Sequence, residues 1–254
     1  MLNLLLMTKG RLRLVSVLEF AAVRDMKRQL ITVIIGVFFL SGCAYGPAMT
    51  DIPLISEKGD MRLNAGVCPH LGAYTTLSYG VTDKIAIQAH ANYEESYSFG
   101  YSSIQGAVGL YRNLGNNRII EAYSGLGYGA GWKYKDVEDE NYDISSDYGL
   151  LFGQFNYGKN GTGKRHFERG VSVRFAGLYA MAIDADNNPD RQYKKGYVTF
   201  EPSAFFRFGG EKLKFGMQLG SVVPLLDDNT YPDIMTYGLN LGLSVNYRLA
   251  VKRK

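Results

Sequence analysis

Apolar and polar residues alternate along most of the chain after residue 59. Between residues 85 and 93, one face carries Ile85, Ile87 and Tyr93, whereas the other carries Gln88 and His90. Successive side chains of a β-strand point to opposite faces, so a period of two predicts strands. The pattern predicts ten strands, at residues 60–67, 71–80, 84–93, 103–114, 118–132, 147–157, 169–182, 197–208, 212–222 and 235–249.

The connections between these strands alternate in length. Short ones are expected at 80–83, 115–117 and 209–211, long ones at 94–102, 133–146, 183–196 and 223–234, and an intermediate one at 158–168. Antiparallel barrels that span membranes have this asymmetry, with short turns at one end and long loops at the other. We therefore expect an all-β, antiparallel up-and-down transmembrane β-barrel of about ten strands, with eight as the alternative count.

Polar and charged residues fall on one face of the predicted strands, opposite the continuous apolar face. An arginine that faces lipid at the middle of a bilayer costs about 2–4 kcal/mol, so these side chains are expected to face the lumen. A soluble barrel or sandwich would instead bury the apolar face. The predicted lumen residues are Lys84, His90, Glu121, Arg174, Glu201, Arg207, Lys214 and Arg248.

The N-terminal part of the sequence contains a short export signal. Met26-Lys27-Arg28 is a positive start, and an apolar run follows from Leu30 to Leu40. This run is too short to cross a bilayer as a helix, which needs about 20 residues. The tetrapeptide Leu40-Ser41-Gly42-Cys43 resembles the lipobox of bacterial lipoproteins, which implies cleavage before Cys43 and lipidation of its thiol.

The signal sequence and the strand pattern together predict five parts in the chain. Residues 1–25 are an upstream or non-native extension, and residues 26–42 are a lipoprotein signal peptide. Residues 43–59 are a lipidated tether outside the domain, residues 60–250 form the barrel, and residues 251–254 are a basic tail.

Residues 60–250 as a whole resemble the small outer-membrane β-barrel proteins of Gram-negative bacteria. The turn Tyr79-Gly80-Val81-Thr82-Asp83-Lys84-Ile85 is similar to a strand–turn–strand signature that recurs in them. The chain departs from the family at its end, because it continues past Tyr247 to Lys254 rather than finishing on an aromatic residue.

The net charge argues against a nucleic-acid partner. The chain has 28 Lys and Arg and 24 Asp and Glu, of which residues 1–42 hold six and two. The remainder is therefore neutral, with 28 − 6 = 22 basic and 24 − 2 = 22 acidic residues. Binding to nucleic-acid phosphates needs a basic surface on the protein that remains after the signal peptide is cleaved.

Three features of the sequence are candidates for chemistry, and none predicts a cofactor. Gly158–Lys164 matches a phosphate loop, but Arg165 replaces the magnesium-binding Ser or Thr and no helix follows. Asp184 and Asp186 have calcium-loop spacing, but Pro189 replaces the required glycine, so they are only weak metal candidates in an acidic loop. The three histidines form no recognisable catalytic group with Ser and an acid.

The sequence therefore predicts a monomeric, lipid-anchored outer-membrane barrel that is not an enzyme. Its expected role is structural or surface-interacting, with a filled or narrow lumen. A narrow pore for small solutes and a lipid-modifying enzyme are the alternatives. The expected partners are outer-membrane lipid and lipopolysaccharide, together with the barrel-assembly and lipoprotein-sorting machinery.

Overall fold

The computed structural model describes residues 51–68, 72–95, 99–137, 140–161, 167–184, 192–226 and 238–249. Every regular element in these ranges is a strand, and no helix among them is long and apolar enough to cross a membrane. The strands are β1 (Met61–Cys68), β2 (Gly72–Gly80), β3 (Ile85–Glu95), β4 (Phe99–Asn113), β5 (Arg118–Val137), β6 (Glu140–Lys159), β7 (Glu168–Asp184), β8 (Gln192–Gly209), β9 (Leu213–Leu226) and β10 (Gly238–Leu249).

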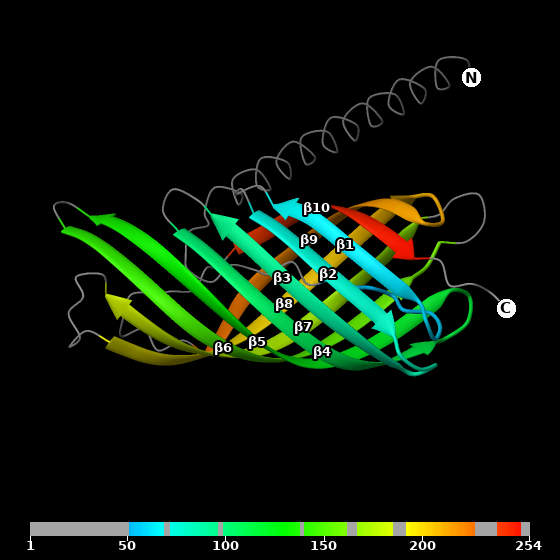
Figure 1. The fold of residues 1–254 in the computed structure, drawn as a ribbon, viewed down its shortest axis with the longest axis horizontal. Coiled ribbons are helices and arrows are strands. Elements are labelled where there is room, and N and C mark those ends of the chain that lie inside the picture. Colours follow the sequence, from blue (N-terminus) through cyan, green and yellow to red (C-terminus); the bar gives the residue numbers. More distant parts are fainter. Residues whose placement is uncertain are drawn as a thin grey trace, which may run out of the picture. The chain divides into compact units, whose positions relative to one another are not determined.

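The ten strands form one closed antiparallel barrel (Figure 1). Each strand pairs with its neighbours in sequence, and β1 closes the sheet against β10 through a ladder from Met61↔Leu249 to Val67↔Leu243. Closure removes the unpaired sheet edges, which a membrane does not tolerate. The predicted fold class, an up-and-down β-barrel of ten strands, is confirmed.

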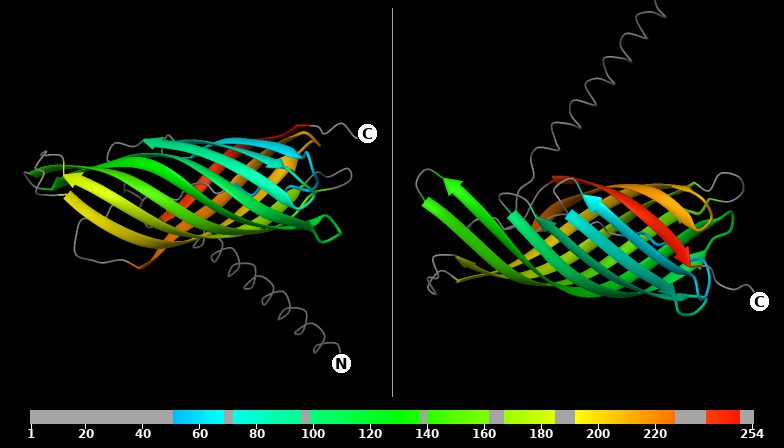
Figure 2. Two further views of the ribbon diagram at one scale, coloured as in Figure 1. Left: turned by 60° about the horizontal axis from the view of Figure 1, so that its bottom comes forward. Right: turned by 45° about the horizontal axis from the view of Figure 1, so that its top comes forward.

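The two ends of the barrel differ. The connections at 81–84, 114–117, 160–167 and 210–212 lie at one end, here called the short-turn end, where β1 begins and β10 finishes. The opposite end, here called the long-loop end, carries the far ends of β5 and β6, which extend beyond their neighbours on one side of the barrel (Figure 2).

The strands near the long-loop end are longer than the sequence pattern predicts. The pattern predicts a loop at residues 133–146, but β5 continues to Val137 and β6 begins at Glu140. The pairs from Lys133↔Ile144 to Val137↔Glu140 complete a hairpin. Polar residues occupy both sets of alternating positions in this range, so no period-two signal marks it as strand.

The side-chain distribution is the reverse of that in a soluble barrel. On the outer surface, Ile104 is 73% exposed and Leu126 is 69% exposed, whereas inside the barrel Arg174 is 2% exposed and Glu121 is 1% exposed. Alternation along each strand places the apolar side chains outward and the charged ones inward. This is the arrangement of a barrel whose outer wall faces lipid.

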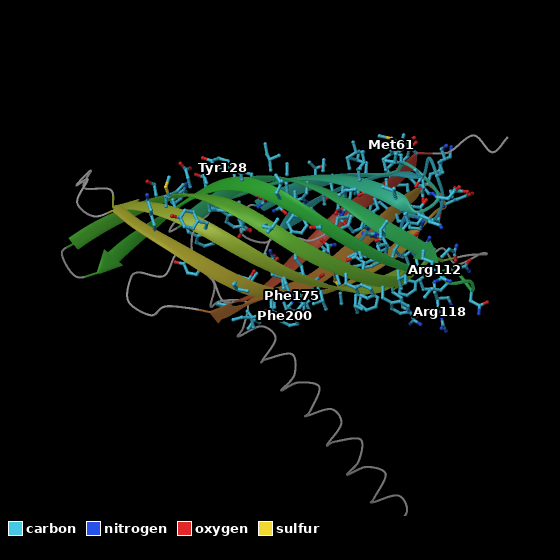
Figure 3. The ribbon with its side chains drawn as sticks, turned by 90° about the horizontal axis from the view of Figure 1, so that it is seen from below. Met61, Arg112, Arg118, Tyr128, Phe175 and Phe200 are labelled. Carbon is cyan, nitrogen blue, oxygen red and sulfur yellow. The ribbon has the colours of Figure 1, made fainter. Side chains whose placement is uncertain are left out.

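Aromatic and basic side chains occur at different places on the outer wall (Figure 3). Phe175 and Phe200 form a tilted aromatic pair across β7 and β8, with ring centroids 5.2 Å apart. At the short-turn end, Lys159 lies in register with Arg118 on one side and Arg169 on the other. Three neighbouring cations repel one another, so this rim suits a position among anionic headgroups.

Glycines on β5 allow large side chains to enter a narrow lumen. A Cβ atom built on Gly125 would lie 2.5 Å from the ring of Phe152, and one on Gly129 would lie 2.3 Å from the ring of Tyr148. Both contacts are shorter than real Cβ atoms permit. The rings on β6 therefore pack directly against the β5 backbone.

We expect the substitution Leu151→Arg to destabilise the barrel. Leu151 is 67% exposed on the outer face of β6, and a lipid-facing arginine near mid-bilayer costs about 2–4 kcal/mol. The measurement is urea unfolding in lipid vesicles, followed by the loss of the faster-migrating, unheated form on a gel. Glu211→Arg, in the turn at 210–212, is the matched control and should shift stability by less than about 0.5 kcal/mol. Equal effects of both variants would contradict a lipid-facing outer wall.

Candidate functional site: the lumen and its N-terminal segment

Residues 51–60, here called the lumen segment, precede β1, and residues 51–55 are buried inside the barrel. Ile52, Leu54 and Ile55 are all 0% exposed. The segment is tied to the short-turn end, where Gly59 N donates to Gly80 O at 2.7 Å and Gly80 N donates to Asp60 O at 2.9 Å. The sequence predicts a tether over residues 43–59. Of that range, residues 51–55 are buried inside the barrel, whereas Glu57 and Lys58 are exposed at the short-turn end.

Apolar side chains of the lumen segment pack against the inner wall. Ile52 and Leu54 form a buried cluster with Ile119 of β5 and Phe205 of β8. Gly158 of β6 makes room for this cluster, because a Cβ atom there would lie 2.6 Å from Leu54 Cδ2.

A second cluster lies on the other side of the segment. Ile55 packs with Ala86 of β3, Tyr111 of β4 and Tyr123 of β5. The two clusters together contact four different strands, so the segment crosses the middle of the lumen rather than following one wall.

Asp51 forms a polar centre that joins four strands. Its carboxylate oxygen Oδ1 accepts hydrogen bonds from Arg207 Nη2 of β8 and Asn64 Nδ2 of β1, both at 2.8 Å. Its backbone carbonyl oxygen accepts from Gln88 Nε2 of β3 at 3.3 Å and Gln154 Nε2 of β6 at 3.1 Å. Since these strands surround the lumen, Asp51 occupies its centre.

The segment also supplies carboxylates to the ion pairs at the short-turn end. Asp60 is 0% exposed and pairs with Arg248 Nε at 2.7 Å and Arg62 Nη2 at 3.4 Å. Glu57 lies 3.3 Å from Arg248 Nη2. Burial raises the pKa of Asp60 and the two arginines lower it, and the net result is a pKa below the usual 3.8.

The barrel wall provides fewer carboxylates than cations in the described ion pairs. Glu168 pairs with Lys214 at 3.1 Å, Arg62 at 3.5 Å and Arg207 at 3.7 Å. Farther toward the long-loop end, Arg174 Nε lies 3.1 Å from Glu201 Oε2.

The lumen segment makes up the difference in charge. In these pairs, the wall contributes five cations and two carboxylates, and the segment contributes three carboxylates. The five carboxylates therefore match the five cations in number. The cations are Arg62, Arg174, Arg207, Lys214 and Arg248, the wall carboxylates are Glu168 and Glu201, and the segment carboxylates are Asp51, Glu57 and Asp60.

Glu121 binds the segment through hydrogen bonds. Its Oε1 accepts from the backbone N–H of Ile55 at 2.6 Å, and its Oε2 accepts from Asn156 Nδ2 at 3.0 Å. Glu121 thus holds the backbone of the segment in addition to filling part of the lumen.

Most of the residues predicted to face the lumen lie there. His90, Glu121, Arg174, Glu201, Arg207 and Lys214 are all buried and point inward. Arg248 lies part-exposed at the short-turn end, bound to the lumen segment. Lys84 does not face the lumen: it is exposed in the turn between β2 and β3, because β3 begins one residue later, at Ile85.

The remaining sequence candidates are not placed by the structure. Cys43 and Asp186 lie outside the described residues. Asp184 is the last residue of β7, and the structure describes its backbone but not its side chain. Within the described ranges, no group of three or more His, Cys, Asp or Glu residues could hold a metal ion.

Sequence reasoning misses the part of the site that precedes β1. Asp51, Asp60, Arg62 and Glu168 are absent from the predicted lumen residues, although each takes part in the ion pairs described above. A signal is present in Ile52-Pro53-Leu54-Ile55, because an exposed tether has little reason to carry four consecutive apolar residues.

A small polar cavity lies beside Asp51. It has a volume of about 10 Å³ and is lined by Gln88, His90, Gln154 and Arg174, among others. His90 Nδ1 hydrogen-bonds with Thr76 Oγ1 at 2.8 Å, and its Nε2 has no hydrogen-bond partner among the described residues. A space of this size and polarity suits one ordered water.

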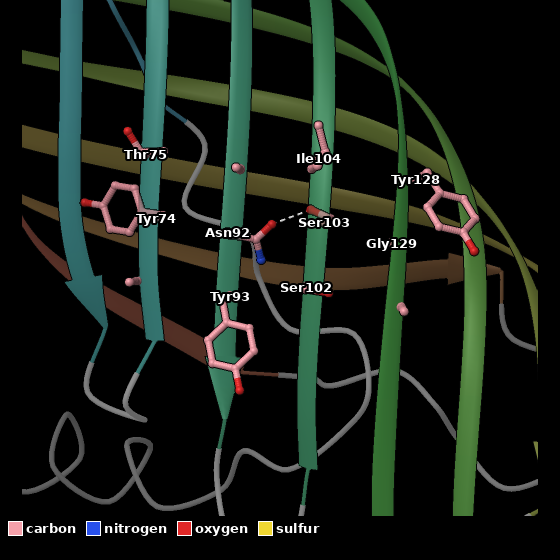
Figure 4. Close-up of a pocket in the computed structure, with 12 residues that line it drawn as sticks. Tyr74, Thr75, Asn92, Tyr93, Ser102, Ser103, Ile104, Tyr128 and Gly129 are labelled. Carbon is pink, nitrogen blue, oxygen red and sulfur yellow. Dashed lines mark hydrogen bonds between the residues drawn. The ribbon is translucent and has the colours of Figure 1, made fainter.

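A larger groove of about 520 Å³ lies across β2–β5, mostly on the outer wall (Figure 4). Small side chains such as Ala91 and Ala130 line it between Tyr93, Ile104 and Tyr128, which are all more than half exposed. Most of the residues that line the groove belong to the apolar outer wall, so it adds surface for lipid contact.

Comparisons with known proteins find similarity at the level of structure alone. No protein-family model matches the chain, and no curated protein sequence matches it significantly. One similar solved structure is the translocator domain of the autotransporter NalP from Neisseria meningitidis, with 14% identity and a TM-score of 0.47, covering 91% of this chain and 98% of that one. A KdgM porin has 10% identity and a TM-score of 0.33, covering 75% of this chain and 99% of that one.

The low pKa of Asp60 predicts a specific loss of stability in acid. A carboxyl group whose pKa is lower in the folded than in the unfolded protein stabilises the fold above the unfolded value, 3.8. That stabilisation is lost as the pH falls below 3.8 through the folded value. Asp60→Asn should therefore be less stable than the wild type at about pH 7, and the difference should shrink at about pH 3, as measured by urea unfolding in detergent. A difference that is constant between these pH values would contradict the ion pairs of Asp60.

Proposed function

We propose that this protein is an outer-membrane lipoprotein whose barrel is closed by its own N-terminal segment, and that its role is structural or surface-interacting rather than catalytic. The observation that carries the proposal is the burial of Asp51, Ile52, Leu54 and Ile55 in the lumen. A barrel filled in this way presents its outer wall to lipid and its loops to partners.

Packing and charge both support a closed lumen. Apolar residues of the segment fill the space between Phe205, Ile119 and Tyr123, and Asp51 binds strands on opposite sides of the barrel. Removing the segment would leave Arg207 buried without the carboxylate of Asp51, at a cost of several kcal/mol. The segment therefore behaves as part of the folded core.

A non-catalytic role agrees with the way the lumen's ionisable groups are used. The buried carboxylates Glu168 and Glu201 pair with wall cations, and Glu121 binds the segment backbone. These groups satisfy one another, which suits a structural core better than a site that must exchange protons with a substrate.

The outer membrane and the lipid anchor complete the proposal. The apolar outer wall and the basic rim at Arg118, Lys159 and Arg169 suit a bilayer with anionic headgroups, and the lipobox-like sequence at Cys43 supplies a site for acyl chains. The partners would be lipid and lipopolysaccharide, together with the machinery that inserts barrels and sorts lipoproteins.

Planar-bilayer recording tests the closed lumen. We expect the purified wild type to show no steady conductance, and the triple variant Ile52→Ala, Leu54→Ala, Ile55→Ala to show intermittent openings, because its segment loses most of its buried apolar surface. A triple alanine variant of the lipid-facing residues Ile85, Ile87 and Leu110 is the matched control and should stay silent. Steady conductance of the wild type would instead favour a narrow pore for small solutes.

A further inference from the structure

The outer face of the short-turn end carries different side chains on its two sides. On each strand, one outward-facing position lies nearest to this end. On the neighbouring strands β4 to β7 it is a cation, and these four residues, here called the basic row, are Arg112, Arg118, Lys159 and Arg169. On the other six strands it is apolar or aromatic, and the residues are Phe208, Leu213, Leu249, Met61, Tyr79 and Ile85. Figure 3 shows Arg112 and Arg118 at the same end of the barrel as Met61.

The cations of the basic row are close neighbours. Lys159 is directly opposite Arg118 of β5 and Arg169 of β7, and directly opposed side chains of a sheet have Cβ atoms about 4.5–5.5 Å apart. Arg112 is opposite Ile120, two residues from Arg118, so it lies diagonal to Arg118. Three spacings of about 4.8 Å between strands give the row a width of about 14 Å.

The backbone beneath the basic row is held by tight turns. Gly115, Asn116 and Asn117 have φ values of 81°, 50° and 60°, and Arg118 N donates to Gly115 O at 3.0 Å. Asn160 N donates to Asn117 O at 2.8 Å and so joins the connection after β6 to the turn between β4 and β5. Cations on such a fixed backbone are arranged before a ligand arrives, which lowers the cost of binding it.

The basic row is not neutralised from within the described part of the chain. None of its four side chains forms an ion pair or a hydrogen bond with another described residue. By contrast, the five cations of the lumen and its short-turn end each pair with a carboxylate. Like charges that are directly opposite each other destabilise a sheet, so an anion from outside the chain would relieve the repulsion in the row.

The surface next to the basic row is apolar. Two residues farther from the rim on β5, β6 and β7, the outward-facing side chains are Ile120, Tyr157 and Val171, which are in register with one another. Two residues advance a strand by about 6.7 Å, or about 5 Å along the barrel axis at a tilt of about 40°. A phospholipid also has its phosphate next to its acyl chains, whereas a soluble anion has no use for an apolar surface.

An aromatic patch borders the row beyond β7. Phe206 of β8 is directly opposite Arg169 and stacks with Phe167 at a centroid distance of 6.0 Å. Phe208 and Phe215 form a second pair, with centroids 6.3 Å apart. All four rings are exposed on the outer wall, so acyl chains of a lipid held at the row would lie against them.

We propose that the basic row is a binding site for the phosphate groups of anionic phospholipid in the membrane leaflet at the short-turn end. Arginine binds phosphate through two parallel N–H···O bonds, and three of the four cations are arginines. Barrels of the outer membrane have their short turns in the periplasm, so this is the periplasmic leaflet. The inference rests on the proposed function, which supplies the membrane.

Tryptophan fluorescence can report the lipid at each end of the barrel. Trp132, the one tryptophan of the chain, lies on β5 toward the long-loop end and lines a groove with Asp147. In a Trp132→Phe background, Tyr157→Trp places a tryptophan two residues from Lys159. Both full-length forms are reconstituted in vesicles of phosphatidylcholine and phosphatidylglycerol, with bromine, a quencher, on the acyl chains of one lipid or the other.

We expect the Tyr157→Trp reporter to be quenched preferentially by brominated phosphatidylglycerol. Trp132, beside an acidic side chain, should show no such preference. Each Lys or Arg near a membrane surface contributes about fivefold to the attraction for anionic lipid, so Lys159→Gln should lower the preference at the reporter by about that factor. The triple variant Arg118→Gln, Lys159→Gln, Arg169→Gln should abolish it.

The matched control removes the same charge at the same end but outside the row. It replaces three exposed lysines of the short-turn end, by Lys58→Gln, Lys84→Gln and Lys212→Gln. This variant should keep the preference for phosphatidylglycerol. Faster gel migration without heating shows that each variant is folded.

Three results would overturn the site. The first is an equal preference for both lipids in the charge-intact reporter, and the second is an equal loss in the row triple and the control triple, which would indicate a general surface potential. The third is competition by inorganic phosphate, but not by chloride at the same ionic strength, which would indicate a site for a soluble anion.

Failure of this inference is distinguishable from failure of the proposed function. Planar-bilayer recording reports the closed lumen independently. A silent barrel without a preference for phosphatidylglycerol would leave the closed-lumen proposal standing and defeat the lipid site. A preference for phosphatidylglycerol in a barrel with steady conductance would support the lipid site and defeat the closed lumen.

Discussion

The structure depends on neutralising the cations that the barrel wall points inward. Arg62, Arg207 and Lys214 converge near the short-turn end, and Glu168 alone cannot balance them. Uncompensated charges in an enclosed space are costly, because the surrounding wall replaces water with groups of low polarity. Asp51 and Asp60 provide the missing carboxylates from a segment outside the sheet. The same ion pairs that stabilise the barrel therefore hold the segment in its lumen.

This constraint links the fold to the proposed function. A ten-stranded barrel is close to the size at which side chains fill the interior, and here a peptide segment takes part in the filling. Gly125 and Gly129 allow rings from β6 to lie against β5, and Gly158 makes room for Leu54. The narrow lumen, its glycines and the apolar residues of the segment are thus parts of one packing arrangement. The proposed closure of the lumen rests on that arrangement.

The barrel is predictable from the sequence because lipid on one side and a polar lumen on the other impose a strict period of two. Where that two-sided environment ends, the period ends too, so the extension of β5 and β6 through 133–146 leaves no signal. The predicted strand at 84–93 begins one residue too early, at Lys84, because the alternation does not mark the end of a turn. The lumen segment escapes prediction for a different reason. Asp51 binds Arg207, 156 residues away, and Ser56 binds Arg248, 192 residues away, and pairing at such distances leaves no local pattern.

The most direct test of the account is the energetic coupling between Asp51 and Arg207, measured by a double-mutant cycle of Asp51→Asn and Arg207→Met in urea unfolding. The two side chains belong to different parts of the fold and meet only if the segment occupies the lumen. The account predicts a coupling free energy of about 1–3 kcal/mol. Effects that add to within about 0.3–0.5 kcal/mol would contradict it, because such additivity is characteristic of residues that are not in contact.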